Sequence, residues 1–198
     1  MQAVPLLVLC GGLSRRMGTP KPLLHFNGQT LIRRIVSHSL PHRPVWLAAA
    51  DNRYPDTEGA HYFPDALPNH EGALSALLPA LEYAAHTGIP NILVMQCDTL
   101  LTGEDIAAAL PPHPAETQIF TDADGKTHPL LGSWAARHAG SLKAYLNTGS
   151  RRIMPWLATI SHHIRPMPPS WQHIHNFNTP QEFQAACEAR RTQEHHER

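Results

Sequence analysis

The stretch LVLCGGLSRRMGTPKPLL, residues 7–24, decides the fold of this chain. Its apolar run ends abruptly at Gly11 and Gly12, and Arg15 and Lys21 follow within ten residues. This pattern predicts a buried strand that leads into a glycine turn whose backbone amides can face a phosphate, with cations nearby to neutralise its charge. The spacing matches neither the P-loop, which ends in Gly-Lys-Ser/Thr, nor the G-x-G-x-x-G fingerprint. We therefore interpret it as a third kind of nucleotide loop.

Length and composition favour one globular domain. The chain has 198 residues, 42% of them hydrophobic, and we expect a single domain over 1–189 followed by a polar tail at 190–198. A formal net charge of zero argues against nucleic acid or a membrane as a partner. No apolar run approaches the roughly 20 residues of a membrane-spanning helix, and no basic region precedes the first apolar stretch. We therefore expect a soluble, cytoplasmic protein.

Cysteine and histidine residues give no metal pattern in the sequence. The three cysteines are far apart, and an odd number of free thiols fits a reducing cytoplasm. The fifteen histidines are scattered, and the pairs 162–163 and 195–196 are adjacent, whereas two ligands on one helix face need a spacing of three or four. We interpret them as ordinary surface or loop histidines.

Buried strands and amphipathic helices alternate through the first half. The predicted strands are 4–10, 45–50 and 91–96, and the predicted helices are 31–40, 74–85 and 102–110. Pro79 interrupts the second helical pattern, so it should kink that helix or set its true start. Short alternation of this kind, with runs apolar on both faces, predicts a parallel sheet covered by helices.

The second half has a different pattern. Strands at 118–121 and 130–134 around a turn at Asp124-Gly125 predict an antiparallel pair, and helical patterns follow near 138–147 and 150–158. Thr179-Pro180-Gln181-Glu182 opens a C-terminal helix, with a polar segment from Arg190 that should fray.

Asp98 directly follows the third predicted strand, at the sheet edge where open α/β sheets bind ligands. It could be an ordinary turn or capping aspartate. Beside a loop of glycines and cations, however, a carboxylate can hold the Mg²⁺ that nucleotidyl transfer needs. Arg15 is a stronger candidate for phosphate binding than Arg16, and a bound anion would offset the conflict between these cations and the helix dipole.

Five segments carry a resemblance to a family. CGGLSRRMGTPKPLL resembles the LAGGxSxRMGxxKxLL signature of the nucleotidyltransferases that make molybdenum guanine dinucleotide. Four later segments are similar to that family's motifs in the same order: 63–65 with 71–74, 96–99, His128-Pro129 with 149–154, and 176–182. Together they span nearly the whole chain.

The resemblance implies a Rossmann-like three-layer α/β/α sandwich of the nucleotide-diphospho-sugar transferase type, with a mostly parallel central sheet. It implies transfer of GMP from GTP to the terminal phosphate of molybdenum-molybdopterin, with Mg²⁺ as cofactor and pyrophosphate as second product. Molybdopterin-transfer proteins and target molybdoenzymes are candidate partners. The implied nucleotide contacts are Leu9, Cys10, Gly11, Gly12, Lys21, Asn52, Asp65 and Asp98, with Lys21, Asp98 and Arg15 catalytic and Asp98 the metal ligand.

The implied acceptor side is made by Asn176 and Asn178, with Arg151 and Arg152 as candidates for the pterin phosphate. A solvated helix start after Ser150 explains the two arginines nearly as well. Four departures from the family pattern concern detail. Pro20 replaces an Asp before the lysine, and Cys10 replaces the Ala of LAGG. Ala50 aligns with the family's asparagine so that Asn52 lies two residues on, and the GPLAG segment becomes Gly-Ala-Leu-Ser-Ala.

Three other functions fit the same sequence. A cytidylyltransferase acting on the same pterin with CTP is the nearest, although Gly11-Gly12 favours guanine. A sugar-phosphate or isoprenoid-precursor nucleotidyltransferase usually has a longer chain or a different second half. A non-catalytic homologue that binds the cofactor would be consistent with Pro20 and the altered GPLAG segment.

Overall fold

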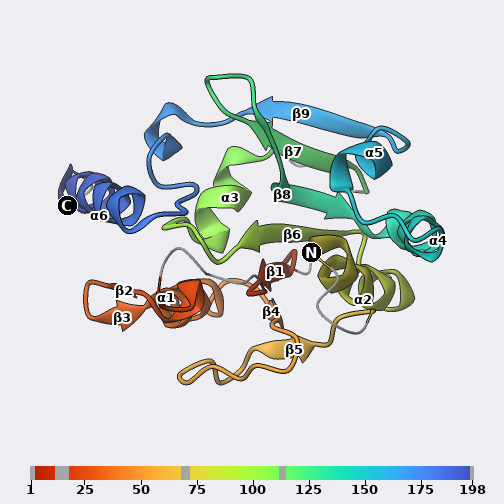
Figure 1. The fold of residues 1–198 in the computed structure, drawn as a ribbon, viewed down its shortest axis with the longest axis horizontal. Coiled ribbons are helices and arrows are strands. Elements are labelled where there is room, and N and C mark those ends of the chain that lie inside the picture. The colour runs from red at the N-terminus through yellow and green to blue at the C-terminus, as the bar shows by residue number, and fades with distance from the viewer. Residues whose placement is uncertain (1–2, 12–17, 68–71, 112–114, 197–198) are drawn as a thin grey trace.

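A seven-stranded sheet lies between two layers of helices in the computed structural model, which describes residues 3–11, 18–67, 72–111 and 115–196 (Figure 1). The strand order is β5-β4-β1-β6-β8-β7-β9. Strand β8 is antiparallel to both of its neighbours, and the other neighbouring pairs are parallel. The strands are β1 (Leu6–Leu9), β4 (Val45–Ala48), β5 (His61–Phe63), β6 (Asn91–Gln96), β7 (Thr117–Thr121), β8 (Thr127–Ala135) and β9 (His162–Pro166), while β2 (His25–Phe26) and β3 (Gln29–Thr30) form a separate hairpin.

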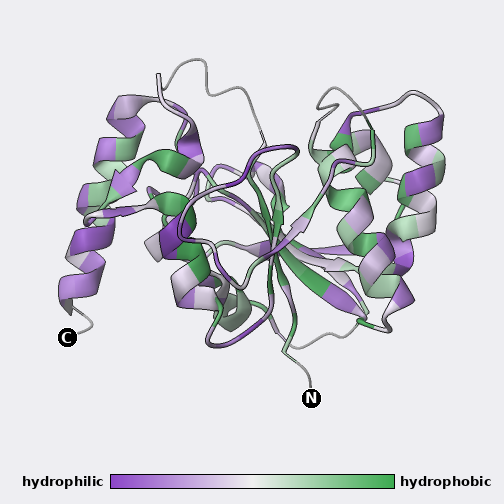
Figure 2. Ribbon diagram, turned by 90° about the horizontal axis from the view of Figure 1, so that it is seen from below, coloured by the Kyte–Doolittle hydropathy of each residue, from purple (hydrophilic) through white to green (hydrophobic). Residues whose placement is uncertain are grey.

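Helices cover both faces of the sheet, as Figure 2 shows with the apolar segments turned toward the centre. One face is covered by α1 (Leu31–Ser39), α3 (Gly103–Ala109) and α6 (Pro180–His196), and the other by α2 (Ala73–His86), α4 (Ala139–Asn147) and α5 (Ile153–Leu157). Short 3-10 turns lie at η1 (Lys21–Leu23), η3 (Ala136–His138) and η4 (Pro169–Trp171). Alternate side chains of β1 enter the two cores, Leu6 and Val8 the first, Leu7 and Leu9 the second. The predicted three-layer, mostly parallel fold is confirmed.

The direction of the chain reverses beside β1. From β1 it proceeds to β4 and β5 on one side and then returns to β6 on the other. The carboxyl ends of β1 and β6 therefore border a topological switch point, where open α/β sheets leave a crevice for ligands. Gly11 and Asp98 follow these two strands.

Local signals placed the main elements correctly. The strand 91–96 coincides with β6, and the antiparallel pair is β7 with β8. Thr102 and Asp105 form the expected capping box at α3, in which the backbone N–H of each residue donates to the side-chain oxygen of the other. Thr179 and Glu182 make the same reciprocal contacts at the start of α6, with 3.2 Å from each backbone nitrogen to the partner side chain.

Pro79 lies inside helix α2, so the alternative in which it sets the helix start is wrong. A proline at this position has no N–H for the carbonyl of Ser75, four residues earlier. That carbonyl instead accepts the backbone N–H of Ala66 at 2.9 Å, and the Ser75 hydroxyl accepts the N–H of Leu67 at 2.8 Å. The proline thus frees an acceptor that holds the loop after β5.

The C-terminal segment also differs from expectation. Helix α6 continues to His196, whereas the polar composition predicts fraying from Arg190 onward. Arg190 pairs with Asp105 at 3.4 Å, and Glu194 pairs with the buried Arg34 at 3.5 Å. These contacts dock the polar end of α6 against α1 and α3, which composition alone does not reveal. Within the described ranges, no helix has the length and apolar character needed to cross a membrane.

Candidate active site

Four neighbouring parallel strands end along one edge of the sheet, and predicted site residues follow each of them. Gly11 follows β1, Asn52 comes after β4, Asp65 after β5 and Asp98 after β6. Because the strands are parallel neighbours, their carboxyl ends share this edge. Gly12 and Arg15, also predicted for this edge, lie outside the described residues.

An ion pair and two amides form the centre of the candidate site. The Lys21 ammonium donates to Oδ2 of Asp98 at 2.8 Å and to Oδ1 of Asn178 at 2.9 Å. The Asn178 amide in turn donates to Oδ1 of Asn176 at 2.7 Å. The structure thus brings together four predicted residues from the loop after β1, the end of β6 and the segment before α6.

Backbone hydrogen bonds explain why these distant segments meet. The Phe177 N–H donates to the Asp98 carbonyl at 3.1 Å, and the Leu100 N–H donates to the Ile174 carbonyl at 2.9 Å. The buried Thr99 hydroxyl donates to that same Ile174 carbonyl at 2.8 Å. The Glu182 carboxylate accepts the backbone N–H of Asn178 at 2.6 Å, so the residue that caps helix α6 also holds the backbone of Asn178 in place. The site is therefore held by the backbone beside it.

Asp98 has an unsatisfied oxygen. The residue is 7% exposed, and its Oδ1 is buried without a hydrogen-bond partner among the described residues. A buried carboxylate oxygen without a partner is costly, and a bound ion or a catalytic role is one of the explanations for such a group. Carboxylate and amide oxygens are the ligands that Mg²⁺ prefers, so Asp98 with Asn176 or Asn178 provides a donor set that fits this ion.

The part of this edge at the end of β1 also contains a tyrosine that no sequence motif marks. The Tyr54 hydroxyl donates to the Cys10 carbonyl at 3.5 Å, and burial raises the pKa of Tyr54 well above its usual range, so the hydroxyl stays protonated. The pKa of the Cys97 thiol is raised by its hydrogen bond with Cys10 and, to a smaller extent, by its burial. All three cysteines are buried and free, in line with the expected reduced thiols. No local pattern marks Tyr54, because its contact crosses from one loop to another.

Asn52 and Asp65 lie on this edge with their own local roles. The Asn52 side chain donates to the Ala49 carbonyl at 3.1 Å, and Ala50 between them has a φ of 51°. The loop that carries Asp65 is held by the Ser75 contacts described above. Nucleotide contact by either residue stays a prediction.

Arg151 and Arg152 lie apart from this group, in the connection between α4 and α5. Arg151 donates to the carbonyls of Leu146 and Ser150 at 2.8 and 2.9 Å, and the Arg152 carbonyl accepts the Tyr145 hydroxyl at 2.9 Å. Helices α4 and α5 pack on the sheet face opposite α6, which follows Asn178. Contact of the two arginines with the acceptor stays a prediction.

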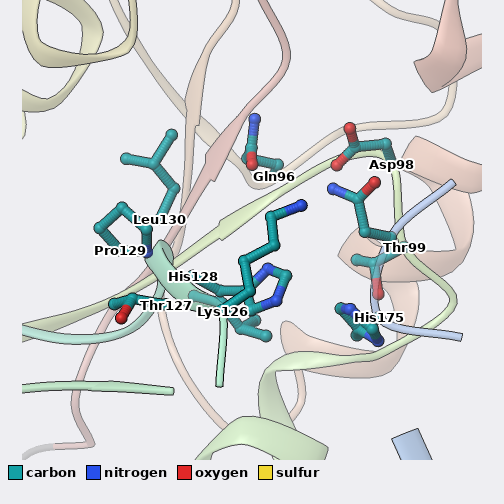
Figure 3. A pocket seen from close by; sticks show the side chains of 11 residues that line it. Gln96, Asp98, Thr99, Lys126, Thr127, His128, Pro129, Leu130 and His175 are labelled. Carbon is teal, nitrogen blue, oxygen red and sulfur yellow. The ribbon is translucent and has the colours of Figure 1, made fainter. Parts of the chain in front are cut away.

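A pocket of about 190 Å³ opens next to Asp98 (Figure 3). The strand β8 and the turn before it supply one wall, and the ends of β6 and the segment 175–176 supply the rest. In Figure 3 the Lys126 side chain extends into this space between His128 and Gln96. The full lining is Gln96, Asp98, Thr99, Lys126, Thr127, His128, Pro129, Leu130, Leu131, His175 and Asn176.

Asp122, His128 and His175 form a cluster at this pocket that the sequence analysis missed. The His128 Nε2 lies 2.8 Å from Oδ2 of Asp122, and the rings of His128 and His175 are 4.8 Å apart between centroids. The hydrogen bond from His128 lowers the pKa of Asp122, and burial lowers the pKa of His175. Spacing could not reveal the cluster, because tertiary folding brings His175 to a turn far away in the sequence.

Comparison with known proteins gives a consistent family. Residues 6–163 match the model of the MobA-like NTP transferase domain. A curated molybdenum cofactor guanylyltransferase of Rhizobium rhizogenes is 29% identical over 196 residues, covering 91% of this chain and 89% of that protein. A second one, from Cereibacter sphaeroides, is 31% identical over 154 residues and covers 77% of this chain and 79% of its own length.

Solved structures show the same fold. Molybdopterin-guanine dinucleotide biosynthesis protein A from Archaeoglobus fulgidus superimposes with a TM-score of 0.72 at 19% identity, over 96% of this chain and all of that one. The 2-C-methyl-D-erythritol 4-phosphate cytidylyltransferase from Thermus thermophilus superimposes with a TM-score of 0.58 at 15% identity, over 96% of this chain and 100% of its own. With the family model spanning most of its length, the chain belongs to the MobA-like NTP transferase domain family and is a nucleotidyltransferase.

Proposed function

We propose that this protein transfers GMP from GTP to the terminal phosphate of molybdenum-molybdopterin, giving the guanine dinucleotide cofactor and pyrophosphate. The names of its curated relatives support this substrate pair. The observation that carries the proposal is Asp98, whose buried Oδ1 is unsatisfied while Oδ2 pairs with Lys21 at the switch point of the sheet. A carboxylate that can hold Mg²⁺ and a cation that can hold phosphate therefore lie together where open α/β sheets bind their ligands.

The nucleotide would bind along the ends of β1, β4 and β5. Gly11 continues β1, where a backbone without side chains lets a phosphate approach closely. Lys21 supplies a compact positive charge within reach of Asp98. Binding of the triphosphate would recruit this ammonium as a partner for phosphate oxygens, in addition to its contacts with Asp98 and Asn178.

Mg²⁺ is the proposed cofactor, held by Asp98 with the amide oxygens of Asn176 or Asn178. When bound, this ion neutralises charge on the triphosphate and on the departing pyrophosphate. The residues of the chain hold the donor oxygens in place: Asn178 is fixed by Glu182 and Asn176, and Asp98 by Lys21 and the Phe177 N–H. Hydrogen bonds from neighbouring residues thus hold the proposed Mg²⁺ ligands in position.

The acceptor phosphate would enter from the pocket on the other side of Asp98. Lys126 lines this pocket, and its ammonium can attract an anion. A phosphate oxygen of the acceptor attacks the α-phosphorus of GTP, a new P–O bond forms, and the bond to pyrophosphate breaks. The attacking group is already an anion, so the reaction needs alignment and charge neutralisation rather than a strong general base.

Pyrophosphate release tests the proposal directly. With molybdenum-loaded molybdopterin, GTP and Mg²⁺, Asp98→Asn should lower turnover at least about a hundredfold, and Lys21→Ala should lower it by a similar factor. The control Asp56→Asn removes an exposed carboxylate that pairs with Arg33 and should keep wild-type turnover. Near-normal turnover of Asp98→Asn at saturating Mg²⁺ would refute the role of this residue.

The choice of base is tested in the same assay. GTP should support release of pyrophosphate, and CTP should not. Faster release with CTP would favour the cytidylyltransferase alternative, and no acceptor-dependent release with either nucleotide would favour a non-catalytic binder.

A further inference from the structure

A three-residue cluster beside the pocket, apart from the ion pair of Lys21 and Asp98, has the donors of a transition-metal site. Asp122 follows β7, His128 lies in β8, and His175 precedes the segment that meets Asp98. One potential ligand atom from each residue lies within 4.8 Å of the other two. A carboxylate with two imidazoles is a donor set that suits zinc and similar ions rather than Mg²⁺.

The carboxylate of Asp122 is oriented by the turn that follows it. Its Oδ1 accepts the backbone N–H groups of Asp124 and Lys126 at 3.1 and 2.9 Å. Its Oδ2 is left facing Nε2 of His128 at 2.8 Å. Two of the three donors are therefore already adjacent, and one of them is anchored by backbone groups.

His175 is oriented in the way that metal-binding histidines usually are. Its Nδ1 lies 2.9 Å from the Trp171 carbonyl, so this nitrogen carries the proton and Nε2 keeps its lone pair. Trp171 is itself fixed, because it is 5% exposed and packs edge-on against Phe120 of β7 at 5.1 Å. The residue that orients His175 thus rests on the strand that leads into Asp122.

The spacing allows one ion to join the three donors. Ligands around a tetrahedral zinc lie about 2.0–2.2 Å from the metal, hence roughly 3.3 Å from one another. Asp122 and His128 would separate slightly from 2.8 Å, and a donor as far as 4.8 Å away would approach by about 1.5 Å, within the range of side-chain rotation. All three residues are half-buried, so they retain room to adjust.

The geometry points to a binding site for one divalent transition-metal ion of the zinc type, held by Asp122, His128 and His175 with a fourth position open to the pocket. Three protein ligands and one exchangeable position are the arrangement of zinc sites that also bind a small molecule. This ion is distinct from the Mg²⁺ proposed at Asp98. The inference does not depend on the proposed function.

Zinc titration of the full chain, freed of metal and without nucleotide, tests the site. We expect Asp122→Asn, His128→Gln and His175→Gln each to weaken binding of one Zn²⁺ at least about tenfold. Circular dichroism checks that each variant is folded. The three substitutions lie in different segments, so a single misfolded variant does not remove the test.

Two controls address the adjacent histidine pair and the cysteines. The double variant His195→Gln/His196→Gln removes the adjacent pair near the C-terminus and should leave the affinity unchanged. Co²⁺ in place of Zn²⁺ should give a tetrahedral visible spectrum without thiolate charge-transfer bands, which excludes the cysteines as ligands. Unchanged Zn²⁺ affinity in all three cluster variants, loss only in the histidine-pair variant, or thiolate bands with Co²⁺ would overturn the assignment.

Discussion

Gly132 occupies a position in β8 where a larger residue has no space. Its φ is +150°, and it pairs with Val94 of β6 on one side and Ile119 of β7 on the other. A Cβ here would collide with the Gln118 carbonyl oxygen and would lie only 3.0 Å from the Ile119 Cα. Both obstacles are backbone atoms inside the sheet, so they cannot move aside as a flexible side chain would.

The cost of Gly132→Ala follows from these contacts. Backbone strain of this kind costs about 1–3 kcal/mol, and forcing an extra methyl into a packed region costs about 1–3 kcal/mol more. We expect the free energy of unfolding to fall by roughly 4 kcal/mol, a large share of the stability of a typical domain. With a denaturant slope of about 2 kcal/mol per molar urea, the unfolding midpoint should fall by about 2 M.

Urea unfolding followed by circular dichroism measures this shift, and Gly140→Ala is the matched control. Gly140 lies in helix α4, where a Cβ would meet nothing within 4 Å. The same substitution there should raise stability by up to about 1 kcal/mol, because alanine is the better helix former. A Gly132→Ala midpoint within about 0.3 M of wild type would refute the steric argument.

Two further predictions concern single side chains. Arg43 donates two hydrogen bonds of 2.7 and 3.0 Å to the carboxylate of Glu104, and this hydrogen bonding lowers the pKa of Glu104. The stabilisation from ionised Glu104 should therefore be complete above its unfolded pKa near 4.3 and should disappear as the pH falls through the lowered folded value. Urea unfolding of wild type and Glu104→Gln should show a difference at pH 7 that shrinks toward about pH 3.5, and a constant difference would contradict this. Ala50 has a φ of 51°, so Ala50→Gly and Ala50→Asn should each raise the free energy of unfolding by up to about 1 kcal/mol in thermal melts. Ala49→Gly, at a buried neighbour without positive φ, should lower it, and a loss of stability in both Ala50 variants would refute the strain.

Continuous apolar runs and capping residues were the parts of the fold that sequence could predict. The run 91–96 is buried on both faces and coincides with β6. Thr102 and Thr179 mark helix starts because their capping partners lie three residues away in the chain. Both signals are local, so no knowledge of distant contacts is needed.

The missed strands lack such signals. Strand β5 has three residues, and β9, at the sheet edge, begins with His162-His163 and has three exposed positions, His163, Ile164 and Pro166. Their strand character comes from pairing with β4 and β7, which is a tertiary contact. Edge strands tolerate polar residues, so an apolar pattern is not required of them.

The candidate site shows the same division. Lys21, Asp98 and the two asparagines were predicted from motifs, and the structure brings them together. The cluster of Asp122, His128 and His175 was not predicted, because His175 reaches the turn that carries the other two residues only through tertiary packing, with Trp171 against β7. Motifs can identify residues in a known arrangement, whereas a new arrangement requires the fold.

Pro79 also limits where the loop after β5 can move. In an uninterrupted helix the amide at position 79 would compete with Ala66 for the Ser75 carbonyl. The proline removes that competitor, so the Ala66 amide has this acceptor without rivalry from the helix ladder. The Ala66 amide lies in a loop, yet it should consequently exchange more slowly than a solvent-exposed loop amide, because its acceptor has no competing donor from the helix. The segment bearing Asp65 is thus tied to α2 through Ser75, by its carbonyl and its hydroxyl, so a substitution at Ser75 would reach the sheet edge without touching a residue of the candidate site.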